Sequence, residues 1–593
     1  MQTPFFPLFS LCLMLVASCT SGVEVESDIT PQDRDYVSYH DTYRNPIITG
    51  FAPDPSICRA ERAAEPGVFD YYLVNSTFEY WPGVPVYHSV DLVNWELIGH
   101  AFQNYGEVEM DTVNSSGGIH ASTIRYHEGT FYMITTNQNN GKSINFITTA
   151  TDPSGPWSEP HVLEGAPGID PSLFFDDDGS VWYTGMHVPE DPEFQGQAEI
   201  WLQEVDLDAW ALKGPRYFPW RGACENGTWA EGPHIYKRNG RYYLMIAEGG
   251  TLHDHAVTLA LADEVTGPYL ASHRNPILTH RHLSYNYPII AVGHADMVEF
   301  DGDRWYMVAL GFRPMETQYK NLGRETYLIP VVWEEEPFWW KDPPNVVPVA
   351  SPVTGKVEWD FPAPIPGTIQ KKRLAWSDEF DSEKLDLEWN FRRTHAEPFH
   401  ELKDGKLMLD AGSGVLANKS KYSWTGIRQR DFVCRAETEM EFNPAKGESA
   451  GLMLIQNENA AYSLLHGDWG EGSQIRLTRH FHGEDSVLAA YKLEQGGAMQ
   501  LAVDMDYLDM DFRYSTDGEN WQVIGKNVDA RDLSPESAGW CYTGLYLGLY
   551  ATANGNDQGK QAAFEYFRYQ GQEYAIPEFD MSQTGLVGTP TRD

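Results

Sequence analysis

Apolar and polar residues alternate in short runs between residues 41 and 340, and turn residues separate these runs. Each unit of the pattern begins with a short apolar run and continues through a Gly turn into an aromatic-rich run. Turns such as Asn239-Gly240 and Asp301-Gly302 indicate β-hairpins, because both central positions of such a turn need positive φ. The first runs centre on Ile57, Ile124, Leu173, Ile235 and Val298, which are 67, 49, 62 and 63 residues apart.

The repeat predicts a five-bladed β-propeller over residues 41–340, with four antiparallel strands in each blade. Third strands follow each hairpin, and fourth strands are expected to start near Trp95, Trp157, Trp210 and Tyr269. A β-sandwich would also contain many hairpins. It would not need five similar units with aligned starts, so the propeller is favoured.

Two further segments follow the repeat. Residues 341–372 contain many prolines and no clear periodicity, which predicts a linker over the surface. Residues 373–576 again show short strand-like runs, and about 200 residues is a normal size for one jelly-roll-like β-sandwich. Residues 577–593 form a C-terminal tail. The predicted fold class is therefore all-β, a propeller followed by a sandwich.

The N-terminus has the pattern of an export signal. The apolar run from Phe5 to Ala17 is too short to span a membrane. Residues 16–19 resemble a bacterial lipobox, although no Lys or Arg precedes the apolar run. We expect residues 1–19 to be a lipoprotein-type signal peptide with Cys19 as the lipidated residue, and residues 20–40 to be a tether. The expected location is the cell envelope (periplasmic or outer-membrane) or the medium, with membrane contact only through that lipid.

Charge and cysteine spacing narrow the classes of partner. The formal net charge is −42, which excludes nucleic acid as a natural partner and disfavours anionic polysaccharides. Six cysteines occur without a CxxC pair, which disfavours a zinc site. Aromatic residues make up 13% of the chain. That share suits β-sheets and also suits sugar binding.

Three acidic residues occupy equivalent positions in three of the repeats. Because the first strand of each propeller blade starts at the central axis, residues just before the anchors should converge. Those residues include Asp54, Asp170 and Glu231, together with His120 and His294. A single Asp-Pro is an ordinary turn former. Three carboxyl groups forced together repel one another and raise at least one pKa, which favours a catalytic site.

Several motifs carry a resemblance to a known family. They are Gly50-Phe-Ala-Pro-Asp-Pro-Ser-Ile57, Ser76-Thr-Phe-Glu-Tyr-Trp-Pro-Gly-Val84, Ile169-Asp-Pro-Ser-Leu173, Ala230-Glu-Gly-Pro-His234, Gly293-His-Ala-Asp296 and Leu322-Gly-Arg-Glu-Thr326. Together they resemble glycoside hydrolase family 43, in its β-xylosidase and α-L-arabinofuranosidase branch. The resemblance implies an inverting mechanism in which Asp54 is the general base, Glu231 is the general acid, and Asp170 modulates the pKa of the acid and orients it.

The resemblance also implies roles around the sugar. Phe78 would line the sugar subsite, with a core position as the alternative, and Arg324 would bind sugar hydroxyls, with a surface ion pair as the alternative. His294 would contact a calcium ion or a water cluster, or would be an ordinary buried histidine. His120 stands where the branch usually has Trp, which puts xylobiose-type specificity in doubt. The chemistry itself would need no cofactor.

Three functions remain open from the sequence. The first is an exo-acting hydrolase that releases xylose or arabinofuranose from hemicellulose-derived oligosaccharides. The second is a non-catalytic surface lipoprotein that binds carbohydrate. In the third, the sandwich acts mainly as a carbohydrate-binding module, with an aromatic platform between Tyr462 and Trp469.

Overall fold

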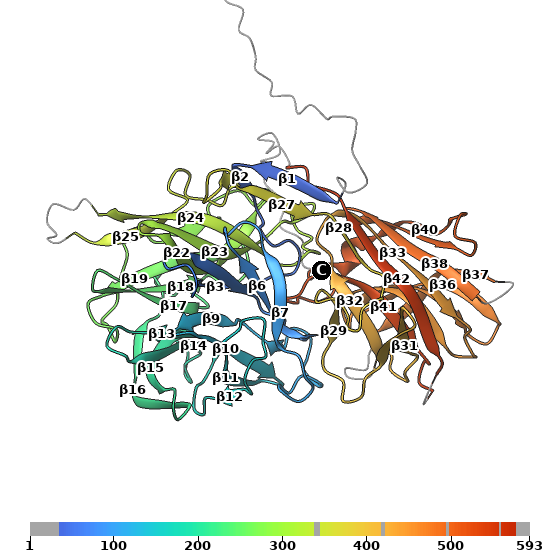
Figure 1. Ribbon diagram of the computed structural model, residues 1–593, viewed down its shortest axis with the longest axis horizontal. Coiled ribbons are helices and arrows are strands. Elements are labelled where there is room, and N and C mark those ends of the chain that lie inside the picture. The colour runs from blue at the N-terminus through green and yellow to red at the C-terminus, as the bar shows by residue number, and fades with distance from the viewer. Residues whose placement is uncertain (1–34, 337–343, 417–421, 494–496, 557–558, 577–593) are drawn as a thin grey trace, which may run out of the picture.

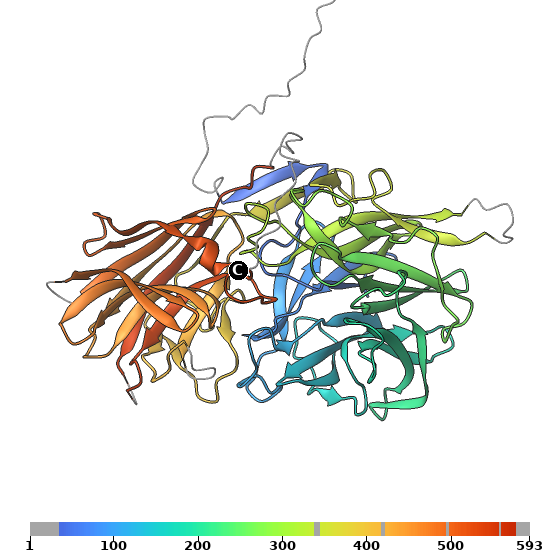
Figure 2. The same cartoon turned by 180° about the vertical axis from the view of Figure 1, so that it is seen from behind.

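The computed structural model describes residues 35–336, 344–416, 422–493, 497–556 and 559–576. Figure 1 shows two all-β bodies side by side, a propeller running from blue to yellow-green and a sandwich running from yellow-orange to red. Figure 2 shows the same arrangement from behind. Among the described residues, no helix has the length and apolar character needed to cross a bilayer. The fold class and the order of the two bodies confirm the sequence prediction.

Each propeller blade is an antiparallel sheet of strands that follow one another along the chain. Blade 1 contains β3 (Ser56–Glu61), β4 (Phe69–Val74), β6 (Gly83–Ser89) and β7 (Glu96–Phe102). Blade 2 contains β8 (Gly118–Ile119), β9 (Thr123–His127), β10 (Thr130–Asn139), β11 (Lys142–Ala150) and β12 (His161–Val162). Blade 3 contains β13 (Ile169–Phe175), β14 (Val181–His187), β15 (Glu199–Asp206) and β16 (Ala211–Trp220).

The last two blades complete the ring. Blade 4 contains β17 (Glu231–Arg238), β18 (Arg241–Glu248), β19 (Ala256–Ala262), β20 (Leu270–Ala271) and β21 (Leu278–Thr279). Blade 5 contains β22 (Ile290–Asp301), β23 (Arg304–Phe312), β24 (Glu325–Glu335) and β25 (Val346–Ala350). All five predicted anchors lie in a strand at the inner end of a blade, β3, β9, β13, β17 or β22. In blade 2 the short β8 precedes β9 and pairs with the same strand, β10. The five-bladed propeller predicted from the repeat is therefore confirmed.

Two predicted boundaries are wrong. The propeller does not end at residue 340, because β25 is the outer strand of blade 5 and lies within the predicted linker. The tether does not extend to residue 40 either, because β1 (Tyr36–His40) pairs with β27 (Ile369–Arg373). A second pair, β2 (Thr42–Arg44) with β26 (Asp360–Pro362), lies beside it. The rest of the predicted signal and tether, up to residue 34, lies outside the described residues.

The blades meet at a buried carboxylate on the axis. Asp296, in blade 5, accepts hydrogen bonds from Ser56 Oγ of blade 1 at 2.7 Å and from Tyr236 Oη of blade 4 at 2.6 Å. It also pairs with Arg125 of blade 2 at 2.7 Å. Burial opposes the charge, but Arg125 and its other neighbours hold the pKa of Asp296 well below its usual value. No described blade combines strands from both ends of the ring. Such side-chain contacts close the propeller together with backbone hydrogen bonds between the segment before blade 1 and blade 5, such as Ile47 N–H to Thr326 O at 2.9 Å.

The sandwich is made of two large antiparallel sheets. The sheet nearer the propeller contains, in spatial order, β37 (Glu484–Lys492), β36 (Ser473–Phe481), β35 (Ala460–Asp468), β34 (Ser449–Asn457), β41 (Tyr546–Thr552), β32 (Ser423–Arg428), β29 (Asn390–Arg392) and the propeller strand β5 (Tyr80–Trp81). The outer sheet contains β30 (His400–Lys403), β31 (Lys406–Asp410), β42 (Gln561–Gly571), β33 (Val433–Phe442), β38 (Gly497–Asp506), β39 (Asp509–Ser515) and β40 (Gln522–Asp529), with β28 (Ala375–Asp378) paired to β42. A 3₁₀ turn, η2 (Ala530–Leu533), follows β40.

The propeller covers one face of the inner sheet. Strand β34 is buried at every position, whereas β33 in the outer sheet alternates between buried and accessible positions. Leu452 of β34 packs between the two sheets, and Met453 packs with Phe51 and Tyr80 of the propeller. Tyr462 is only 2% exposed, in the core between the sheets. The predicted aromatic platform starting at Tyr462 is therefore wrong, because β35 is an interior strand.

Candidate active site

One pocket of about 340 Å³ lies where the first strands of the blades converge. All seven residues predicted for the site line this pocket: Asp54, Phe78, His120, Asp170, Glu231, His294 and Arg324. The convergence predicted from the repeat is thus observed. The remaining lining includes residues that the sequence analysis missed: Thr228, Trp229, Thr251, Leu252, Trp540 and Tyr542.

Irregular backbone turns the axial side chains toward the pocket. Asp54, Asp170 and His294 have φ of 50°, 55° and 46°, in the left-handed region that ordinary residues avoid. Register shifts interrupt the pairing of β13 around Asp170, of β17 after Glu231 and of β22 around His294. A β-bulge adds a residue and re-aims a side chain, which is why bulges occur beside active sites. Gly232 is required here, since a Cβ would lie 2.9 Å from His294 Nε2.

Asp54 lies in a positive environment. Arg324 Nη1 donates to Asp54 Oδ1 at 2.8 Å, and Ser76 Oγ donates to Oδ2 at 2.7 Å. His294 Nδ1 is 3.6 Å from Oδ1. Burial acts to raise the pKa of Asp54, but Arg324 first, then His294 and Ser76, outweigh it and leave that pKa below its usual value. Asp54 therefore remains an ionised carboxylate at neutral pH.

Glu231 has the opposite environment. Burial raises the pKa of Glu231 well above its usual value, and the charges of Asp170 and Asp54 raise it further, against a smaller effect of Arg324. Burial also raises the pKa of Asp170, to about 6. Asp170 Oδ2 accepts from the backbone N–H of Gly232, the residue after Glu231, at 3.2 Å. The pocket therefore combines Asp54, whose surroundings favour the ionised carboxylate, with Glu231, whose surroundings favour the protonated acid, and the charge of Asp170 adds to that effect on Glu231.

The polar and aromatic walls are packed around these acids. Phe78 is 2% exposed and its ring lies 4.8 Å from the His120 ring and 5.6 Å from that of Tyr542. Phe78 therefore lines the pocket and also belongs to the core. Arg324 is buried, so a surface ion pair is wrong. Burial lowers the pKa of His120 to about 4, which leaves its ring neutral.

Two family models match separate parts of the chain. Residues 43–338 match the model of glycosyl hydrolases family 43, and residues 377–570 match the β-xylosidase C-terminal concanavalin A-like domain. A xylosidase/arabinosidase of Butyrivibrio fibrisolvens is 38% identical over 535 residues, which cover 88% of this chain and 98% of that protein. The chain belongs to glycosyl hydrolase family 43.

Two further relatives have the same architecture along their length. The non-reducing end α-L-arabinofuranosidase BoGH43B of Bacteroides ovatus is 34% identical, over 89% of this chain and 95% of that protein. The crystal structure of a xylan β-1,4-xylosidase from Bacillus halodurans superposes with a TM-score of 0.80 at 32% identity, covering 89% of this chain and 100% of that one.

The acids of this family 43 chain do not fit a calcium ion held directly. Asp170, Glu231 and His294 offer ligand atoms within 4.8 Å of one another. Calcium prefers six to eight oxygen ligands, and His294 offers nitrogen. A cation between the two carboxyl groups would also lower the pKa of Glu231, against the direction in which its surroundings shift that pKa. A hydrated ion or a water cluster beside His294 stays a prediction.

The sandwich supplies part of the pocket wall in this family 43 chain. Tyr542 N–H donates to Ser116 Oγ at 2.8 Å, and Arg324 Nη2 approaches Tyr542 O at 3.5 Å. The segment around Tyr542 is held from the sandwich side as well. Gln456 Nε2 donates to Thr543 O at 2.8 Å, and Asn459 Nδ2 donates to Ala538 O at 2.9 Å.

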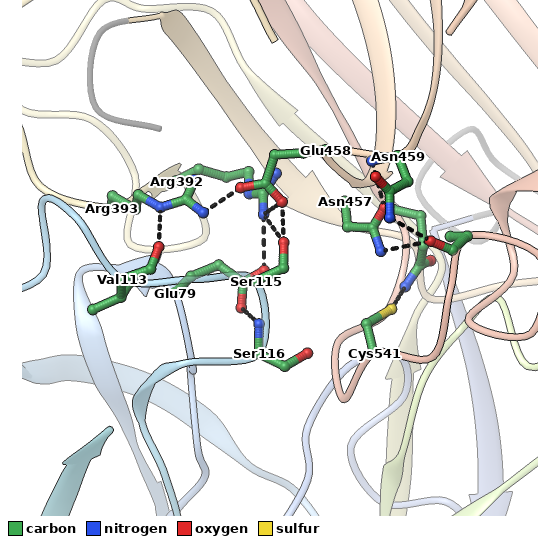
Figure 3. A network of polar contacts seen from close by, with 12 residues as sticks. Glu79, Val113, Ser115, Ser116, Arg392, Arg393, Asn457, Glu458, Asn459 and Cys541 are labelled. Atoms are coloured by element: carbon green, nitrogen blue, oxygen red, sulfur yellow. Dashed lines mark hydrogen bonds and ion pairs between the residues drawn. The ribbon is translucent and has the colours of Figure 1, made fainter. Parts of the chain in front are cut away.

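A buried ionic network joins the two bodies beside this segment (Figure 3). Arg392 pairs with Glu79 of the propeller at 2.9 Å and with Glu458 of the sandwich at 3.0 Å. Arg393 also pairs with Glu458, and its Nε donates to the propeller carbonyl of Val113 at 2.6 Å. Both guanidinium groups are fully buried. The network fixes the turn that contains Glu458, and with it the segment that carries Tyr542.

The pocket residues that were not predicted differ in how far the sequence indicates them. Trp229 lies two residues before Glu231, so its place beside the acid could have been inferred from the sequence. Trp540 and Tyr542 come from a different domain, and no repeat pattern relates them to the propeller axis. Their contribution depends on how the two bodies dock.

Proposed function

We propose that this chain is an inverting exo-glycosidase that releases single pentoses, xylose or L-arabinofuranose, from hemicellulose-derived oligosaccharides. The observation that carries the proposal is the contrast between Asp54 and Glu231, whose pKa values move in opposite directions within one pocket. A single-step displacement needs an ionised base and a protonated acid at the same time. A non-catalytic binding protein has no need of that contrast.

In this mechanism Asp54 accepts a proton from a water molecule, and the oxygen of that water attacks the anomeric carbon. Glu231 donates its proton to the glycosidic oxygen as the bond to the leaving group breaks. Asp170 raises the pKa of Glu231 through its charge and holds the backbone beside it through Gly232. Arg324 and Ser76 keep Asp54 ionised and oriented.

The pocket favours release of a terminal sugar. Its floor consists of buried polar groups, and Phe78, Tyr542 and other side chains wall it in. Relatives in the same family carry xylosidase and arabinofuranosidase names, so both pentoses are candidate glycones. His120 presents a neutral polar ring where a Trp would stack. We propose that His120 favours a glycone that is held by a hydrogen bond to the imidazole ring over a glycone that is held by stacking on an indole.

A panel of nitrophenyl pentosides, with NMR of the first-formed anomer, tests the proposal. We expect turnover of a β-xyloside or an α-L-arabinofuranoside with inversion. Asp54→Asn should abolish turnover on every substrate. Glu231→Gln should lose far more activity on a disaccharide than on a nitrophenyl glycoside, whose leaving group needs little protonation. Retention of configuration, or equal losses of Glu231→Gln on both substrates, would contradict the mechanism.

We further propose that the chain is exported and anchored by a lipid on Cys19. The lipobox-like residues 16–19 and the preceding apolar run support this. Mass spectrometry of the mature N-terminus is the test, with Cys19→Ala as the control. A diacylglycerol-modified Cys19 is expected in the wild type, and an unmodified N-terminus starting elsewhere would contradict the anchor.

A further inference from the structure

The pocket changes character from floor to rim. Asp54, Asp170 and Arg324 are at most 5% exposed. Three other lining residues are large, apolar and much more exposed: Trp229 at 38%, Trp540 at 40% and Leu252 at 48%. A folded protein gains nothing by exposing two indoles and a Leu around one opening, and such a patch marks a binding surface. These exposed apolar side chains therefore indicate that the rim of the pocket binds part of a ligand.

The indole of Trp229 is held rigidly. A Cβ at Gly196 would lie 2.0 Å from Trp229 Cζ3, and a Cβ at Gly250 would lie 3.5 Å from Trp229 Cδ1. Gly196 thus leaves the room that the six-membered ring of Trp229 occupies, and Gly250 lies at ordinary contact distance from the five-membered ring. Trp229 itself has φ of 54°, which is strained for a bulky residue, and its N–H donates to Gly196 O at 2.7 Å.

The loop before Trp229 is also anchored. The buried carboxylate of Glu248 accepts from Ala223 N–H at 2.8 Å, and Gly249 N–H donates to Thr228 O at 2.8 Å. These contacts fix the loop from both ends. A strained backbone that is held in place by several contacts is typical of residues in ligand-binding and active sites. A merely solvent-exposed Trp would need neither.

The position of Trp229 in the chain indicates which part of a substrate its side chain would contact. Glu231, two residues later, is the group that must reach the glycosidic oxygen. The glycone lies on the floor beside Asp54, so the leaving group extends from Glu231 toward the rim. Resting on the proposed function, we infer that Trp229, with Leu252 and Trp540, forms an apolar platform that binds the leaving-group sugar of an oligosaccharide. Flat carbon–hydrogen faces of a pyranose suit such side chains.

The test compares two substrates with the same glycone. One is the pentose-containing disaccharide, and the other is the methyl pentoside, whose leaving group is too small to reach the rim. Both leaving groups are alcohols that need Glu231, so acid catalysis is matched between them. Trp229→Ala should lower kcat/KM for the disaccharide about 10–100-fold. It should leave kcat/KM for the methyl pentoside within a factor of about two of the wild type.

Trp229→Phe should retain part of the preference for the disaccharide. Trp521→Ala is the matched control, because that indole packs against Arg435 in the sandwich, 4.8 Å from the guanidinium, and lies outside the pocket lining. Equal losses on both substrates, or a shifted pH profile on the methyl pentoside, would mean that Trp229 only supports Glu231 and would overturn the inference. An unchanged disaccharide rate would also overturn it. A wild-type enzyme that turns over neither substrate would instead refute the proposed function.

Discussion

Replacing Glu458 by Gln removes the one carboxylate that pairs with both Arg392 and Arg393. The side chains of both arginines are 0% exposed, whereas that of Glu458 is 19% exposed. Arg392 Nε and Nη1 and Arg393 Nη1 already lack partners among the described residues. The variant would leave two buried guanidinium groups against the single carboxylate of Glu79, whose pKa burial already raises.

Removing one partner of a buried ion pair costs about 3–5 kcal/mol, mostly because the other charge stays buried. Since the Glu458 carboxylate is partly exposed, water can replace some of the lost contact, and the lower value of about 3 kcal/mol is expected. For a unit of about 150–250 residues, each kcal/mol shifts Tm by about 2–4 °C. The unfolding transition should therefore fall by about 6–12 °C.

Differential scanning calorimetry measures this shift, and Glu379→Gln is the matched control. Glu379 accepts two hydrogen bonds from Arg568, both at 2.9 Å, but the two side chains are 47% exposed. Such a pair contributes less than about 1 kcal/mol. Because the turn of Glu458 also holds the segment of Tyr542, KM should rise in Glu458→Gln and not in the control. If both variants unfold within about 2 °C of the wild type, the network does not stabilise the interface.

Three further outcomes follow from the electrostatics of the pocket. Asp170→Asn removes a charge that raises the pKa of Glu231, so the alkaline limb of kcat/KM should move to lower pH, and an unmoved limb would count against the pairing. Arg324→Gln removes the cation that lowers the pKa of Asp54 most, so the acid limb should move to higher pH in the same pH–rate measurement. EDTA should leave the rate on nitrophenyl pentosides unchanged, and activity restored by added Ca²⁺ would show a direct role for the ion.

The repeat made the acids predictable, because a propeller places equivalent positions of successive blades on one axis. Asp54, Asp170 and Glu231 could therefore be found without any structural information. The end of blade 5 could not be found in this way, since β25 contains Pro348 and resembles a loop in sequence. An outer strand pairs on one side only, so a residue without an N–H is tolerated there. The strand Tyr36–His40 could not be predicted from the local sequence either, because its partner, β27, lies more than 300 positions away in the chain.

The sandwich is best understood as a wall of the active site. One propeller strand, β5, completes its inner sheet by pairing with β29, and apolar residues such as Met453 and Trp424 face the propeller. That face is covered and is not free to bind a polysaccharide. Meanwhile Tyr542 closes the pocket against Arg324 and Phe78. Separating the two bodies would expose the apolar face of the inner sheet and leave Arg392 and Glu79 without each other as ion-pair partners. It would also open the pocket on the side that Tyr542 closes. Stability and exo specificity therefore depend on the same interface.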